Sequence, residues 1–120
     1  MLDVDKSIEA IRSAAAERKF ISYGSVARAS DVLWSAKVRS LMRPHLEGVC
    51  EKMLGEAGAM ISAIVVNKTN LVSGELDPQS LTGFIDCARR LGLGVVDDRD
   101  KFLREQQTLT FAWGERTMNK

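Results

Sequence analysis

The stretch that most constrains the fold runs from Lys19 to Pro44, KFISYGSVARASDVLWSAKVRSLMRP. Ser22 is a good N-cap for a short helix over the residues that follow it. The pair Ser30-Asp31 carries two strong capping side chains and is expected to end this helix and to start the next. A short extended entry, a helix, a turn and a second, cation-bearing helix together predict a helix-turn-helix unit.

Pro44 limits the length of the second helix. Apolar residues keep helical spacing from Leu33 to Met53, but proline removes a backbone hydrogen bond and clashes with the preceding turn, costing about 3 kcal/mol. Two outcomes fit the sequence: the helix kinks at Arg43, or it ends there and another begins with Pro44 in its first turn. We expect a break or a marked kink.

The segment after these helices predicts a wing. Ala59–Val66 is rich in β-branched residues and indicates a buried strand. Residues 67–70 form a turn, and Leu71–Ser73 returns as a second short strand that Gly74 ends. A strand, a turn and a returning strand predict a short antiparallel β element beside the helix-turn-helix.

Three more helices are expected outside this core. An apolar stripe predicts a helix over Asp3–Arg18, with Asp3 or Asp5 as its N-cap. Asp77-Pro78 begins a second helix, and Asp97-Asp98 caps a third. Thr108–Trp113 also alternates like a strand, but helix is favoured because KFLREQQ leads into it without a breaker.

The sequence thus predicts an α+β fold, a winged helix-turn-helix-like core with two added C-terminal helices. A chain of 120 residues, 45% of them hydrophobic, fits one domain over 1–120, with the core at 1–74 and the helical pair at 75–115. The longest apolar run is too short to cross a bilayer. The N-terminal residues lack the apolar region of a signal peptide, so a cytoplasmic location without a membrane partner is expected.

Charge is distributed unevenly although the net charge is only +1. Arg12 to Arg43 contains seven cations and two acids, a local charge of +5 that leaves −4 for the other residues. This asymmetry suggests an anionic partner for the positive part, although charged helical positions are often simply solvated. The candidate phosphate contacts lie on the second helix, the turn before it and the tip of the wing: Arg28, Lys37, Arg39, Arg43 and Lys68.

The run Ile21-Ser-Tyr-Gly-Ser-Val-Ala27 resembles the I-S-Y-G-x-[LV]-A segment of O6-alkylguanine-DNA alkyltransferases and alkyltransferase-like proteins. The resemblance implies a winged-helix fold that approaches duplex DNA. It places Tyr23 beside a phosphate and makes Arg39 the nearest candidate for an arginine inserted into a groove. The family's P-C-H-R nucleophile motif is absent, since the corresponding region reads SAIVVNK. Alkyl transfer is therefore not expected.

No catalytic, metal or cofactor constellation is visible in the sequence. His45 is the only histidine, and Cys50 lies off its helical face, so the two cannot assemble a four-ligand zinc site. Cys50 and Cys87 share no motif and are expected to be buried thiols. Trp34 can stack on a ligand, but a tryptophan that enters a helix is more often a core anchor. The acids at 97, 98 and 100 complement a helix dipole.

Two functions fit these observations. The first is a non-enzymatic accessory or regulatory protein that binds duplex DNA or other nucleic acid through Leu33–Arg43 and the wing near Lys68. The second is a protein-interaction module, such as an inhibitor or immunity-type protein that binds an enzyme. The sequence does not identify the partner, the oligomeric state or the pathway.

Overall fold

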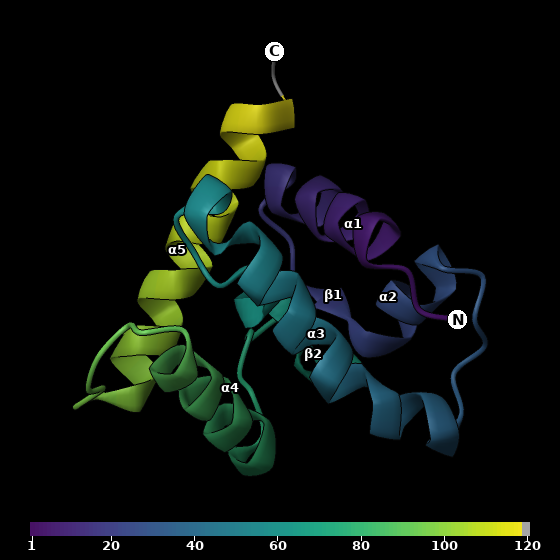
Figure 1. The fold of residues 1–120 in the computed structure, drawn as a ribbon. Helices are drawn as coiled ribbons and strands as arrows, with labels where there is room; N and C mark the ends of the chain where they lie inside the picture. Colours follow the sequence, from purple (N-terminus) through teal and green to yellow (C-terminus); the bar gives the residue numbers. More distant parts are fainter. Residues whose placement is uncertain (119–120) are drawn as a thin grey trace.

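Figure 1 shows the computed structural model, which describes residues 1–118 as five α-helices packed around a short buried segment. The helices are α1 (Val4–Ala16), α2 (Tyr23–Ala29), α3 (Ala36–Ala57), α4 (Pro78–Arg90) and α5 (Arg99–Met118). The strands β1 (Ile21–Ser22) and β2 (Val65–Val66) and the 3₁₀ turns η1 (Ile61–Ile64) and η2 (Lys68–Asn70) complete the fold.

The winged-helix prediction is wrong. The two strands are each two residues long, and they pair in parallel, with Ile21 opposite Val65 and Ser22 opposite Val66. The expected return strand does not form: the chain turns through η2, and Val72 is 97% exposed. The fold is mainly helical rather than a helix-turn-helix with an antiparallel wing.

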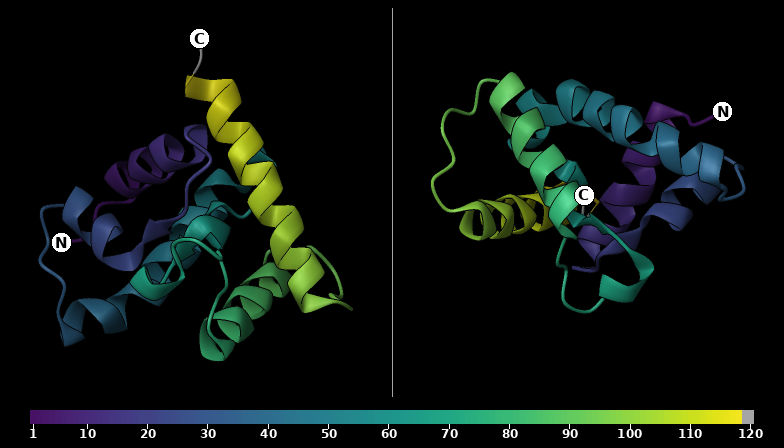
Figure 2. Two further views of the ribbon diagram at one scale, coloured as in Figure 1. Left: turned by 180° about the vertical axis from the view of Figure 1, so that it is seen from behind. Right: turned by 90° about the horizontal axis from the view of Figure 1, so that it is seen from below.

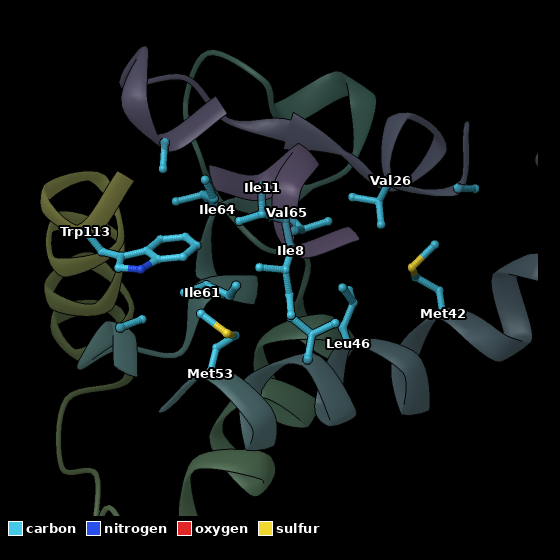
Figure 3. Close-up of a cluster of buried hydrophobic side chains, with 14 of the residues drawn as sticks. Ile8, Ile11, Val26, Met42, Leu46, Met53, Ile61, Ile64, Val65 and Trp113 are labelled. Atoms are coloured by element: carbon cyan, nitrogen blue, oxygen red, sulfur yellow. The ribbon is translucent and has the colours of Figure 1, made fainter. Parts of the chain in front are cut away.

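Burial on all sides explains the apolar run that resembled a strand. Ile61, Ile64 and Val65 face the core cluster that Figure 3 shows, together with α1, α2, α3 and Trp113 of α5. Met60 and Ala63 face a second cluster formed with α4 and α5. The segment therefore lies between two apolar clusters. Its β-branched side chains are buried by packing against helices, without pairing into an extended sheet.

Local capping fixes most helix starts. The Asp3 carboxylate accepts from the Lys6 amide at 3.0 Å, and Ser22 Oγ accepts from the Ser25 amide at 3.1 Å. Asp77 accepts from the Ser80 amide at 2.9 Å, with Pro78 in the first turn of α4. These side-chain acceptors satisfy amides that have no partner within the helix. The predicted starts of α1, α2 and α4 are confirmed.

The predicted start of α3 is wrong. Asp31 adopts a left-handed backbone conformation with φ of 59°, which takes the chain out of α2, and its side chain does not cap a helix. The chain then runs without helix to Ser35, whose Oγ accepts from the Val38 amide at 3.2 Å and begins α3. Four residues therefore separate Asp31 from the first helical residue, Ala36.

Pro44 does not end α3, so of the two predicted outcomes, a break or a marked kink, the break is ruled out. The helix continues from Ala36 to Ala57 with Pro44 inside it. Pro44 and Ser40 are both exposed, so the Ser40 carbonyl, which loses the amide it would have paired with, faces water. Packing of the buried face, including Met42 and Leu46, holds the helix together across the proline.

The C-terminal helix belongs to the same core as the N-terminal one. α5 is helical through Thr108–Trp113, as predicted, and the Asp98 carboxylate accepts from the Lys101 amide at its start. α5 packs against α1, and the left view of Figure 2 shows the two helices meeting. Trp113 is fully buried, and Arg12 lies 4.9 Å above its ring centroid. α5 is therefore integrated into the central core rather than added to it.

Candidate functional site

A pocket of about 550 Å³ opens between the first half of α3 and α4. Its floor comes from Ser62 of η1 and Val65 of β2, and the loop before α4 closes one wall with Asn67 and Asp77. Met42, Leu46 and Phe84 contribute apolar surface, and polar or charged side chains make up much of the remaining lining. The volume of the pocket is in the range typical of ligand sites.

An aromatic pair stands at the edge of the pocket. The Tyr23 and Trp34 rings are stacked, with centroids 6.4 Å apart and planes 20° apart. Trp34 is 45% exposed, whereas Tyr23 is half-buried and donates through its hydroxyl to Ser80 Oγ at 3.4 Å. Burial raises the pKa of Tyr23, so its hydroxyl stays protonated. The expectation of Trp34 as a core anchor is wrong, because the indole lies at the surface.

A hydrogen-bonded polar group forms the adjoining wall. The Asp77 carboxylate accepts from the Ser80 amide, from Ser80 Oγ at 2.8 Å and from Asn67 Nδ2 at 3.0 Å. The hydrogen bond from the Ser80 amide lowers the pKa of Asp77, despite partial burial. Asp77 is therefore a carboxylate that holds Ser80 and Asn67 in fixed orientations. Together the three side chains offer hydrogen-bond donors and acceptors to a ligand.

Two arginines lie on the α3 side. Arg39 is exposed and forms no ion pair within residues 1–118. Arg43 Nε lies 3.4 Å from the Glu47 carboxylate, and its guanidinium packs over Gly83 of α4. Glu47 also pairs with Arg90 at 2.6 Å. Arg39 is thus the arginine whose charge remains available to an anion.

The predicted contact residues divide into two groups. Tyr23, Arg39 and Arg43 line the pocket, although they come from separate segments. The other three, Arg28, Lys37 and Lys68, are exposed and do not line it. Sequence reasoning missed the wall from the α4 side, because the Asp77-Pro78 signal predicts a helix start and says nothing of what that turn faces.

Ser7 and His45 form a close polar pair that is not a catalytic site. Ser7 Oγ lies 2.7 Å from His45 Nε2, joining α1 to α3. Ser7 is fully buried, and neither residue lines the pocket described above, so no substrate reaches the hydroxyl there. Burial lowers the pKa of His45, while the Asp3 carboxylate opposes this shift. The pair is a structural hydrogen bond between two helices.

This pair predicts a loss of stability in mild acid. The pKa of His45 in the folded protein lies below its ordinary value of about 6.5. The unfolded chain therefore binds a proton more readily than the folded protein, and the stability that neutral His45 contributes at higher pH is lost as the pH falls below about 6.5. Urea midpoints should therefore fall between about pH 7.5 and pH 5.5. His45→Gln removes the only histidine and should flatten the profile in this range. An equal slope in the variant would contradict this assignment.

The described residues contain neither a candidate metal site nor a candidate membrane span. Within residues 1–118, no three His, Cys, Asp or Glu side chains gather as metal ligands, and no helix is long and apolar enough to span a membrane. Comparison of the chain with protein-family models, curated proteins and solved structures found no match. The alkyltransferase-family resemblance therefore stays a prediction, and the functional argument rests on the pocket.

Proposed function

We propose that the protein is a non-enzymatic nucleic-acid-binding protein, with an accessory or regulatory role, whose pocket receives an unpaired base. One observation carries this proposal: Tyr23, Arg39 and Arg43, selected from the sequence as nucleic-acid contacts, line a single pocket beside the exposed ring of Trp34. An aromatic platform with flanking cations suits single-stranded or locally unpaired nucleic acid, since any base can stack and any phosphate can pair.

The chemistry of the pocket fits a heteroaromatic ring better than a chain-like ligand. Apolar residues such as Met42 and Phe84 can cover the faces of a base. The Asn67–Asp77–Ser80 wall can hydrogen-bond with its edge, because an amide and a hydroxyl both donate and accept. Arg28, Lys37 and Lys68 are assigned to phosphates outside the pocket, where they supply affinity without selecting a base.

A second candidate function rests on the exposed loop before α3. Leu33 is 87% exposed beside Trp34, and apolar side chains exposed together are common at protein interfaces. A protein partner seated there would cover the mouth of the same pocket. We place either function in the cytoplasm, because two free cysteines persist in a reducing compartment.

Fluorescence anisotropy with labelled oligonucleotides tests the first function. We compare a duplex, a single strand and a duplex with one unpaired base between about 50 and 200 mM salt. The unpaired-base duplex should bind most tightly, and replacing that base by an abasic site should weaken binding. No detectable binding to any of them at low salt would refute the proposal and leave the protein-interaction function.

Arg39→Ala combined with Arg43→Ala should weaken this binding about tenfold or more and reduce the salt slope, because the phosphate contact of Arg39 and the positive charge of Arg43 beside it are both lost. Lys101→Ala combined with Arg116→Ala is the matched control, since it removes the same charge from exposed positions on α5. Equal losses in both double variants would mean that net charge, and not the pocket face, governs binding.

A further inference from the structure

Two cysteines far apart in the sequence lie in one buried cluster beside the pocket. Cys50 lies on α3 and Cys87 on α4, and both are buried in one apolar cluster. Cys50 Sγ is within hydrogen-bond distance, 3.1 Å, of Ser62 Oγ, and Ser62 lines the pocket floor. Cys87 lines this pocket and a second one on the far side of the same wall, with Glu47 and Arg90. A small solute can therefore approach Cys87 through either pocket.

The two thiols have different acidities. Interaction with the neighbouring Cys50 side chain lowers the pKa of Cys87 to about 7, assisted by Arg90, while burial and Glu47 oppose the shift. The same interaction, together with burial, raises the pKa of Cys50 well above its ordinary value. Cys87 is thus the more acidic of the two thiols, and Cys50 is the one that stays protonated. A pocket-lining thiolate beside a cation and a second thiol is the usual environment of an oxidisable cysteine.

We propose that Cys87 is a site of oxidation by hydroperoxides and that Cys50 resolves the oxidised cysteine as a disulfide between α3 and α4. This site does not depend on nucleic-acid binding. The disulfide is reversible, as redox-active pairs in a reducing compartment are.

The proposed reaction proceeds in two steps. The Cys87 thiolate attacks the terminal oxygen of the hydroperoxide; the O–O bond breaks, and the alkoxide leaves as the alcohol after taking a proton, so Cys87 becomes a sulfenic acid. The Cys50 sulfur then attacks the Cys87 sulfur, the S–O bond breaks, and hydroxide leaves as water with the Cys50 proton. Two thiols are oxidised by two electrons in all, and the hydroperoxide is reduced to alcohol and water.

Intact mass spectrometry of the full chain after treatment with hydrogen peroxide tests the site without any nucleic acid. The wild-type monomer should lose the mass of two hydrogens, lose both free thiols and yield one peptide pair joining Cys50 to Cys87. Dithiothreitol should restore the starting mass. A monomer that gains oxygen without closing, a dimer linked between chains, or thiols that stay reduced would each overturn the proposal.

Single variants then assign the two roles. In Cys50→Ser the sulfenic acid has no resolving partner, so dimedone should label Cys87. In Cys87→Ser the remaining Cys50 should stay unlabelled under the same conditions. Dimedone labelling of Cys50 in Cys87→Ser at the rate seen for Cys87 would overturn the assignment of roles. Serine is close to cysteine in size, and circular dichroism checks that each variant is folded.

Discussion

Gly114→Ala should lower the free energy of unfolding by about 3 kcal/mol, because its methyl group has no space to occupy. An added Cβ would lie 2.4 Å from Ala15 Cβ and 2.6 Å from the Ala16 amide nitrogen of α1. The opposing atoms are backbone and a short side chain, so no flexible group can move aside. Ala15 and the neighbouring Trp113 are fully buried, and any separation of α1 from α5 would open the core around them.

Gly55→Ala is the matched control for this prediction. Gly55 is exposed within α3, and an added Cβ there meets nothing within 4 Å. Alanine has the higher helix propensity, so this change should stabilise the protein by about 0.5–1 kcal/mol. Urea denaturation of both variants measures the contrast. Similar stabilities for Gly114→Ala and the wild type would show that α1 and α5 are not closely packed at this point.

The parts of the fold that sequence reasoning predicted are those decided within one turn of chain. Asp3, Ser22 and Asp77 each cap a helix by accepting from the amide three residues ahead, so the residue type and its position suffice. The expected helix over Thr108–Trp113 is confirmed for the same reason, since no breaker separates it from the Asp98 cap. Cys50 and Cys87 are buried and free, as expected of apolar thiols.

The predictions that are wrong concern segments whose structure depends on packing between distant parts of the chain. The β-branched run before Asn67 fits either a strand or a segment enclosed by helices. It is enclosed because α4 and α5, which come later in the chain, pack against it. Pro44 is tolerated because the buried face of α3 outweighs one lost hydrogen bond. Asp31 has a side chain suited to capping a helix, but its left-handed backbone conformation places it in a turn.

The pocket, too, depends on packing between distant parts of the chain, so only part of its lining could be predicted. Tyr23, Arg39 and Arg43 were selected as contact residues from the cationic stretch Lys19–Pro44, without a prediction that a pocket forms there, and all three line the pocket. Its α4 side depends on which face of a later helix turns inward, and no periodicity in the sequence specifies that α4 lies opposite α3. The same crossing brings Cys50 near Cys87, a pair that spacing alone does not join.

The loop that carries the pocket wall depends on Gly74, and Gly74→Ala should destabilise the protein by about 3 kcal/mol. Gly74 has φ of +71°, which disfavours any side chain, and an added Cβ would lie 2.2 Å from Phe20 Cζ. Phe20 is held by Phe111, whose ring centroid is 5.4 Å away in an edge-on arrangement. On the other side, Gly74 O accepts from the buried Gln107 Nε2 at 2.8 Å, so the backbone has no free direction in which to move.

Gly92→Ala separates the two causes of this loss. Gly92 has φ of +84° but open space around an added Cβ, so only the conformational cost of about 1 kcal/mol applies. Phe20→Ala should in turn relieve part of the Gly74→Ala cost, giving a non-additive double variant in urea denaturation. Because Asn67 and Asp77 stand on either side of this loop, Gly74→Ala should also weaken binding in the pocket, whereas Gly92→Ala should not. Equal destabilisation by the two alanines would mean that Phe20 yields easily and that the pocket wall is not held by this contact.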